Sequence, residues 1–312
     1  MDGITKRHIS VVIPVLNEEV IISELLSRVL QTIKQISQNV EVLIIDDGST
    51  DKTWKEITDF TLSNKNIRGI RLSRNFGHHY AISAGLQLAD SDWVVVMDGD
   101  LQDRPEVITD LYNEAIKGFD IVFVSRTNRP EALYYRILQK LFYMILRLLS
   151  GVNFNSQQAN FSIISNKVVN SFNKFPEYSR FYGSTINWLG FSRSSIRANH
   201  GTRKNGRSSY TYRKRIKLAA DVILSFSDRP LHFAIYLGII SSSAALILMT
   251  WIVYGVLHAG FSVEGWPSLM ATLLLIGGII LIILGIIGSY LSRIFLQVKS
   301  RPLFLIQDEI SS

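Results

Sequence analysis

Short apolar runs rich in β-branched residues alternate with longer amphipathic segments over residues 1–125. The short runs predict strands, whereas apolar positions that recur every three or four residues predict helices. Strands are expected at Ile9–Val15, Val40–Asp46, Ile67–Leu72, Trp93–Asp98 and Asp120–Ser125, with helices near residues 18–36, 52–62, 79–89 and 105–117. This alternation predicts an α/β fold in which a mostly parallel sheet carries helices on both faces. Ligands of such sheets bind outside the carboxyl ends of the strands.

Two much longer apolar runs follow toward the end of the chain. Leu231–Leu257 and Leu269–Leu291 contain no Asp, Glu, Lys or Arg. Each exceeds the roughly 20 residues with which an α-helix crosses the hydrocarbon core of a bilayer. We therefore predict two transmembrane helices, with a pair of buried core helices as the alternative. Lys and Arg flank both runs but are absent from the connecting residues 258–268, so the positive-inside rule places both ends of this hairpin in the cytoplasm.

Charge is distributed unevenly along the 312 residues, whose formal net charge is +7. Residues 1–131 carry 20 acidic and 14 basic side chains, whereas residues 132–220 carry 15 basic side chains and a single acid, Glu177. The acidic part is typical of a metal-using enzyme, and the basic part predicts an anionic partner. Nucleic acid and anionic lipid would both bind such a basic segment. Because the apolar runs lie next to it, we expect anionic lipid to be the partner and expect no binding of nucleic acid.

Two segments within or beside the basic part have the pattern of helices that lie in the membrane interface. They are Leu133–Ser150 and Arg213–Phe226, and an ordinary domain-packing helix is the alternative for the first. The chain has no cysteine, which excludes a disulfide framework and a thiolate metal site. Its first ten residues contain no apolar stretch, so no cleavable signal peptide is predicted.

Polar and acidic residues follow the first two predicted strands. Asn17 and Glu18 come after the first strand, and Asp46 and Asp47 come at the end of the second. Their oxygens suit the ribose hydroxyls and base N–H groups of a nucleotide, with solvated turn residues as the alternative for the two aspartates. The following residues should form a tight turn at a glycine and a helix cap, for which Asp51 is the candidate.

A pair of carboxylates, Asp98 and Asp100, follows the fourth predicted strand in the sequence MDGDLQD. Mg²⁺ and Mn²⁺ prefer oxygen ligands, and Mg²⁺ usually shares them with substrate phosphates. A cation there would neutralise a diphosphate and help it leave. The pair His78-His79 opens the third predicted helix. We expect it to pack and cap, and contact with a phosphate or sugar is the alternative.

Five segments together resemble family 2 glycosyltransferases: PVLNEE, DDGSTD, SRNFGHHYAISAGL, MDGDLQD, and WLGF followed by R-x-x-G-x-S. The closer likeness is to the polyprenyl-phosphate branch, which includes bactoprenol glucosyltransferases and dolichol-phosphate mannose synthase, and it covers nearly the whole chain. It implies a Rossmann-like nucleotide-diphospho-sugar transferase domain followed by interfacial helices and two transmembrane helices. The chain departs from the branch at residues 155–161, where many relatives carry an acid and a glycine before the phenylalanine, and where Gln157 and Gln158 cannot act as anions.

The resemblance implies roles for individual residues. Nucleotide-sugar binding is expected from Pro14, Asn17, Glu18, Asp46, Asp47, Gln102, Arg203 and Ser208. Metal binding is expected from Asp98, Asp100 and Gln102, and binding of the acceptor phosphate from Arg126, Arg136 and Lys140. The catalytic set is expected to be Asp98, Asp100, Arg126 and Arg136.

The resemblance also implies an organisation of the chain. Residues 1–230 would form a cytoplasmic glycosyltransferase domain, with the nucleotide-sugar and metal part at about 1–130 and the acceptor-side part at about 131–230. Residues 231–298 would form the transmembrane hairpin and residues 299–312 a cytoplasmic tail. The oligomeric state is left open, with a homo-oligomer as one option.

These observations predict an inverting, Mg²⁺- or Mn²⁺-dependent transfer of a hexose, from UDP-glucose as first choice, to undecaprenyl phosphate at the cytoplasmic face of a bacterial inner membrane. A phosphate acceptor is already anionic, whereas a hydroxyl acceptor needs a general base, for which residues 132–220 offer only Glu177. The alternatives are a hydroxyl acceptor, a processive polysaccharide synthase, and a non-catalytic module that binds lipid or nucleotide. The synthase is disfavoured because no Q-x-x-R-W segment is present.

Overall fold

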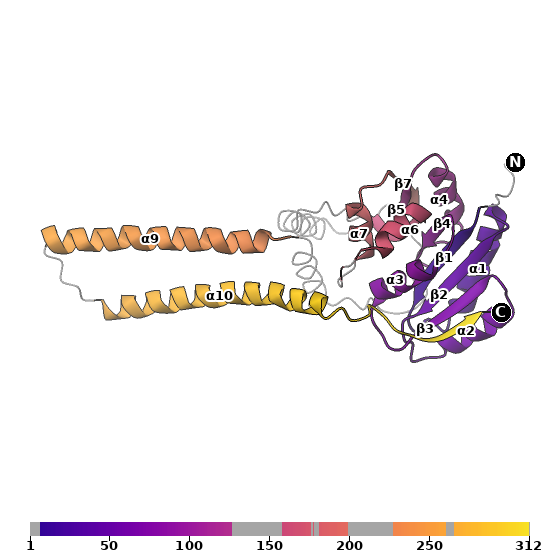
Figure 1. Ribbon diagram of the computed structural model, residues 1–312, viewed down its shortest axis with the longest axis horizontal. Helices are drawn as coiled ribbons and strands as arrows, with labels where there is room; N and C mark the ends of the chain where they lie inside the picture. Colours follow the sequence, from indigo (N-terminus) through magenta and orange to yellow (C-terminus); the bar gives the residue numbers. More distant parts are fainter. Residues whose placement is uncertain are drawn as a thin grey trace, which may run out of the picture. The chain divides into compact units, whose positions relative to one another are not determined.

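A computed structural model describes residues 7–126, 158–175, 177, 181–198, 227–259 and 265–311. The described residues belong to two compact units. The sheet unit contains the described residues up to 198 together with residues 301–311, and the helical unit contains the two long helices (Figure 1). The interfacial helices predicted at Leu133–Ser150 and Arg213–Phe226 lie outside the described residues.

The sheet unit is an eight-stranded sheet with the order β7-β5-β6-β4-β1-β2-β3-β8. Its strands are β1 (Ile9–Val15), β2 (Val40–Asp46), β3 (Ile67–Leu72), β4 (Trp93–Val96), β5 (Ile121–Arg126), β6 (Gln158–Ser165), β7 (Arg193–Ala198) and β8 (Ile306–Ser311). All neighbours pair in parallel except β6, which is antiparallel to β4 and β5, and β8, which is antiparallel to β3. The predicted α/β class with a mostly parallel sheet is therefore confirmed.

Helices cover both faces of the sheet (Figure 1). One face packs against α1 (Ile22–Ile36), α2 (Thr53–Leu62) and α4 (Val107–Ala115), and the other against α3 (His78–Leu88), α6 (Asn166–Asn173) and α7 (Tyr182–Trp188). Strand β1 is buried along its whole length, which explains its unbroken apolar run. Helix α3 approaches it so closely that a Cβ at Gly85 would overlap the Val12 side chain.

The first three predicted strands match the structure, but the prediction that the fourth extends to Asp98 is wrong. Strand β4 ends at Val96, where its pairing with Val12 of β1 also ends. The chain then turns and passes close to the end of β1. A Cβ at Gly99 would lie 2.7 Å from the Val15 side chain and 3.0 Å from the Pro14 carbonyl oxygen. Asp98 and Asp100 therefore lie on a loop that packs against β1.

The final strand, β8, was not predicted from the sequence, where residues 299–312 were expected to form a tail. It pairs with β3, and Arg68 of β3 donates from Nε to Oε1 of Glu309 at 2.7 Å. Just before β8, the N–H of Ser73 donates to the Leu305 carbonyl oxygen at 2.9 Å, and Phe304 packs against the apolar core. This end of the chain is thus part of the sheet unit and covers the edge of β3.

Ending the chain after Ser300 should destabilise the sheet unit, because the truncation removes β8 and exposes the hydrogen-bonding edge of β3. With about 1 kcal/mol per lost hydrogen bond, we expect an apparent Tm several degrees lower and increased aggregation. Thermal unfolding of the detergent-purified chain, followed by light scattering, measures both. Asp308→Ser serves as the control, because it changes an exposed side chain and keeps the strand. Equal Tm values for the truncated and complete chains would show that β8 contributes nothing.

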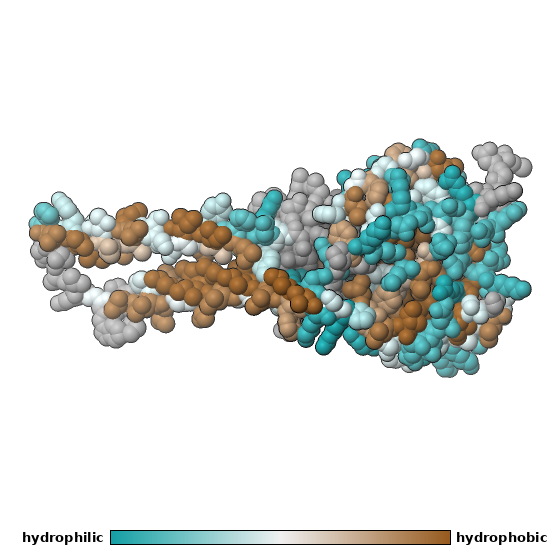
Figure 2. Space-filling model, in the orientation of Figure 1, coloured by the Kyte–Doolittle hydropathy of each residue, from teal (hydrophilic) through white to brown (hydrophobic). Residues whose placement is uncertain are grey.

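The helical unit consists of α9 (Arg229–Ala259) and α10 (Trp266–Val298). Within it, the Tyr290 hydroxyl of α10 donates to the Ser227 carbonyl oxygen, just before α9, at 2.6 Å. Both helices are long and apolar enough to cross a membrane, and Figure 2 shows apolar side chains along both of them. They contain the two predicted spans, Leu231–Leu257 and Leu269–Leu291.

Candidate active site

The loops that follow β1, β2, β3 and β4 meet at the carboxyl edge of the sheet, because these four strands are parallel neighbours. This arrangement brings together the acidic segments that the sequence singled out. Residues 16–19 follow β1, residues 47–52 follow β2, residues 73–77 follow β3, and residues 97–102 follow β4.

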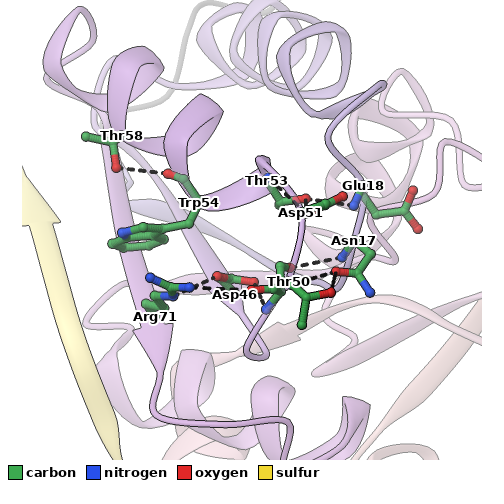
Figure 3. Close-up of polar contacts among 10 residues, drawn as sticks. Asn17, Glu18, Asp46, Thr50, Asp51, Thr53, Trp54, Thr58 and Arg71 are labelled. Atoms are coloured by element: carbon green, nitrogen blue, oxygen red, sulfur yellow. Dashed lines mark hydrogen bonds and ion pairs between the residues drawn. The ribbon is translucent and has the colours of Figure 1, made fainter.

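The loop after β1 is joined to the loop after β2 by a series of hydrogen bonds (Figure 3). Asn17 has a positive φ of 57° and accepts from the Thr50 N–H at 2.9 Å through Oδ1. The N–H of Glu18 donates to the Thr53 hydroxyl at 2.8 Å. Asp51 accepts from the N–H of Thr53, the first residue of α2, at 3.0 Å, but the N-cap position itself is Lys52, one residue after the predicted cap. Asn17 and Glu18 thereby hold the two predicted nucleotide-binding loops in one fixed arrangement.

Asp46 lies fully buried at the end of β2. Its Oδ1 accepts from the Ser49 N–H at 3.0 Å, and its Oδ2 lies 3.5 Å from Nε of Arg71. The Arg71 guanidinium also lies near the Trp54 ring, 5.8 Å from its centroid (Figure 3). Burial raises the pKa of Asp46 above its usual value, although the Ser49 hydrogen bonds and Arg71 oppose that shift. Arg71 and Trp54 are neighbours of this acid that the sequence reading had not identified.

Asp47 is also buried, and it organises the loop that follows β3. Its two carboxylate oxygens accept from the N–H groups of Phe76 and Gly77 at 2.8 and 2.9 Å. Burial raises its pKa, and these two hydrogen bonds partly offset the shift. The adjacent Gly48 has φ of +75° and lies so close to Arg74 that a Cβ would be 2.6 Å from the Arg74 carbonyl carbon. In this structure Asp46 and Asp47 shape the loops, and direct contact with a nucleotide stays a prediction.

The metal-binding candidates lie on the loop after β4, with Pro14 at the neighbouring end of β1. Asp100 accepts from the N–H of Gln102 at 3.1 Å, which stabilises the turn at Leu101, where φ is 59°. Asp98 remains partly exposed, at 27% of its side-chain surface, and its Oδ1 lies 3.2 Å from Nε2 of His78. The structure therefore places Asp98, Asp100 and Gln102 on one short loop at the carboxyl edge.

His78 and Asn160 complete this corner of the site. His78 begins α3, and its Nε2 lies 3.3 Å from the Asn160 side-chain nitrogen on β6. Burial opposes a charge on the ring, but the carboxylates of Asp98, Asp47 and Asp100 together raise the pKa of His78 above its usual value. His78 was expected to pack and cap, and its ring also contacts the predicted metal ligand Asp98, whereas contact with a phosphate or sugar stays a prediction. The signal in the sequence that could have indicated Asn160 is its position directly before the buried Phe161.

His79 packs as expected, with its ring edge-to-face against Phe181 at a centroid distance of 5.3 Å. Burial lowers the pKa of His79 from 6.5 to about 3. Its Nδ1 is buried without a hydrogen-bond partner in the part of the chain that the structure describes. His79 is therefore a neutral, structural residue at neutral pH.

The buried His79 should make the protein less stable in acid. Between pH 6.5 and 3 the unfolded chain binds a proton at His79 that the folded chain does not bind, so stability falls as pH falls. At pH 5 this loss is about 2 kcal/mol. His79→Phe should remove it, and thermal unfolding of both proteins at pH 7.5 and pH 5 measures the difference. His8→Phe is the control. The prediction would be contradicted if His79→Phe lost as much stability between pH 7.5 and pH 5 as the original chain.

The donor atoms at this loop fit a hard divalent cation. Carboxylate oxygens of two aspartates suit Mg²⁺ or Mn²⁺. No group of three or more His, Asp or Glu side chains within the described ranges could hold a metal by itself. Asp98 and Asp100 would therefore share the cation with phosphate oxygens of a substrate.

Several predicted residues fall where side chains are not described. Arg126 is the last residue of β5, so its backbone lies at the carboxyl edge of the sheet. Arg136, Lys140, Arg203 and Ser208 lie outside the described residues. Their predicted contacts with phosphates stay predictions.

A mostly parallel sheet with carboxylates on the loops at its carboxyl edge is typical of nucleotide-sugar transferase domains. Residues 10–176 match the family model described as glycosyl transferase family 2. The chain belongs to this family and is a glycosyltransferase.

Two relatives that match nearly the whole chain come from bacteria. The SfII prophage-derived bactoprenol glucosyl transferase of Shigella flexneri is 32% identical, with 96% of this chain and 97% of that protein covered. The undecaprenyl-phosphate 4-deoxy-4-formamido-L-arabinose transferase of Pectobacterium carotovorum is 31% identical, with 98% and 94% covered. The fold is similar to that of glucosyl-3-phosphoglycerate synthase from Mycobacterium tuberculosis in complex with Mn²⁺, UDP and phosphoglyceric acid. That match has a TM-score of 0.52 and 20% identity, and it covers 70% of this chain and 76% of the other.

Proposed function

We propose that this glycosyltransferase moves a hexose from a nucleotide-diphosphate sugar to a polyprenyl phosphate, with undecaprenyl phosphate as the acceptor. The observation that carries the proposal is the carboxyl edge, where the Asp98 and Asp100 loop packs against the end of β1. The names of two relatives, a bactoprenol and an undecaprenyl-phosphate transferase, support the class of acceptor.

The chain path supports delivery of an anionic acceptor to the same edge. Strand β5 ends there at Arg126, and β6 begins there at Gln158, since Ser125 pairs with Gln158. Strand β7 ends there at Ala198, because it is parallel to β5. The basic stretches 127–157 and 199–226 therefore connect to the sheet at the edge that carries the acids. Arginine side chains suit a phosphate because their planar guanidinium can bind two of its oxygens.

The chemistry that we propose is one direct displacement. An oxygen of the acceptor phosphate forms a bond to the anomeric carbon of the sugar, and the bond from that carbon to the donor diphosphate breaks with inversion. The nucleoside diphosphate leaves with the bonding electrons. A bound Mg²⁺ or Mn²⁺ would supply Lewis-acid stabilisation of the leaving diphosphate. Asp98, Asp100 and Gln102 would hold that cation, while Arg126 and Arg136 position a nucleophile that needs no general base.

We further propose that α9 and α10 cross a bacterial inner membrane as a hairpin, with both termini and the sheet unit in the cytoplasm. Their length and apolar composition support the crossing. The basic residues on the outer flanks of the hairpin, and their absence between residues 258 and 268, support the orientation. The sheet unit, to which residues 301–311 belong, would then act as the catalytic domain at the membrane surface.

The deciding experiment is transfer of radiolabelled sugar from a panel of UDP- and GDP-sugars to undecaprenyl phosphate by the purified chain, with and without Mg²⁺ or Mn²⁺. We expect metal-dependent label in a chloroform-soluble, mild-acid-labile product, with UDP-glucose as the best donor. A product with retained anomeric configuration would contradict the displacement. Nucleotide binding without any lipid product would instead favour a hydroxyl acceptor.

A further inference from the structure

His78 lies where three elements of the sheet unit converge. It is the first residue of α3, it faces Asp98 on the loop after β4, and it meets Asn160 on β6. Its side chain keeps 39% of its surface exposed, so the ring forms part of the wall of the site. Nε2 of His78 lies 3.2 Å from the buried Oδ1 of Asp98, which is close enough for the ring to influence the orientation of the Asp98 carboxylate.

The surroundings of His78 hold its ring in place. The preceding Gly77 donates its N–H to Asp47 at 2.9 Å, which ties the start of α3 to the end of β2. The His79 ring lies edge-to-face with the His78 ring at a centroid distance of 5.5 Å and also packs against Phe181. Asn160 approaches Nε2 from β6. Because an asparagine amide can be turned to present either its oxygen or its nitrogen, Asn160 can accommodate either ring tautomer.

We propose that His78 is a positioning residue for Asp98, an inference that rests on the metal-binding role proposed above for Asp98. Nε2 of His78 lies 3.2 Å from Oδ1 of Asp98, so a protonated Nε2 would donate to that oxygen and select one rotation of a carboxylate whose χ2 torsion is otherwise broad. The selected rotation presents the carboxylate to the cation that binds the donor diphosphate. Removing a residue that hydrogen-bonds to a metal ligand typically lowers metal affinity or activity 10- to 100-fold.

The test is direct Mn²⁺ binding to the full chain in detergent, with and without UDP, measured from the electron paramagnetic resonance signal of free Mn²⁺. His78→Leu should raise the Kd for Mn²⁺ about tenfold or more. His78→Gln places an amide N–H near the position of Nε2 and should recover most of the affinity. His8→Leu is the matched control, because the described contacts of His8 are made by its main chain. Asp98→Asn tests the metal site itself.

The outcomes separate the two proposals. If Asp98→Asn abolishes Mn²⁺ binding while His78→Leu binds like His8→Leu, the positioning role is overturned and the metal site stands. If Asp98→Asn leaves Mn²⁺ binding unchanged, the metal site fails and the positioning role fails with it. A His78→Gln variant as weak as His78→Leu would overturn donation of the N–H. Circular dichroism of each variant establishes that it is folded.

Discussion

Replacing Asp98 and Asp100 together with Asn should reduce sugar transfer about 1,000-fold in the presence of saturating Mg²⁺ or Mn²⁺. The two substitutions keep the size of both side chains but remove the charges that would hold the cation. Loss of about 4 kcal/mol of transition-state stabilisation corresponds to that factor. The measurement is the rate of lipid-linked product formation at several metal concentrations, which also reports whether more metal restores the rate.

Asp90→Asn is the matched control for this pair. Asp90 is an exposed acid just before β4, so it lies at the opposite edge of the sheet from the site. The control should keep the full rate, and both variants should keep the thermal stability of the unchanged chain. A double variant that retains its rate and its metal dependence would show that the cation binds elsewhere.

Replacing Arg126 and Arg136 singly with Ala should weaken binding of the lipid acceptor. A charge-assisted hydrogen bond contributes about 1.5 to 3 kcal/mol, which corresponds to roughly a 10- to 150-fold loss of affinity. The KM for undecaprenyl phosphate should therefore rise by about that factor, while the KM for the nucleotide-sugar stays nearly constant. Initial rates in mixed micelles, with each substrate varied in turn, separate the two constants.

A lysine substitution and a control at a distant arginine test whether the effect comes from the guanidinium group at this position. Arg126→Lys keeps the charge but loses the planar fork, so its KM for the lipid should fall between those of the unchanged chain and Arg126→Ala. Arg193→Ala is the control, because Arg193 starts β7 at the other edge of the sheet and donates to Asn187 at 2.9 Å. A larger rise in the KM for the nucleotide-sugar than for the lipid would reassign these arginines to the donor.

Much of the fold followed from local patterns in the sequence. Strands β1 to β3 were located to the residue, because buried parallel strands leave continuous apolar runs between polar helix ends. The long helices α9 and α10 were located by the absence of charge over more residues than a bilayer requires. The gathering of the acidic loops followed as well, because the carboxyl ends of parallel neighbours lie at one edge.

Other features depend on residues that are distant in the sequence. Strand β8 is short and polar, and its pairing joins Arg68 to Glu309 across 241 positions. No periodicity of residues 299–312 indicates which edge they join, because an edge strand buries little of its own surface. The meeting of His78 with Asn160 spans 82 positions and arises because β6 runs antiparallel beside β4.

The sequence by itself determined the family resemblance, the α/β class, the two long apolar helices and the order of the acidic loops. These properties are encoded in local composition and spacing, which report on which face of an element is buried. Only the tertiary structure decided that Asp46 and Asp47 are buried where β2 ends, that His78 contacts Asp98, and that residues 306–311 join the sheet. Those features depend on which distant side chains and strand edges meet, and a local pattern of apolar and polar positions carries no information about such meetings.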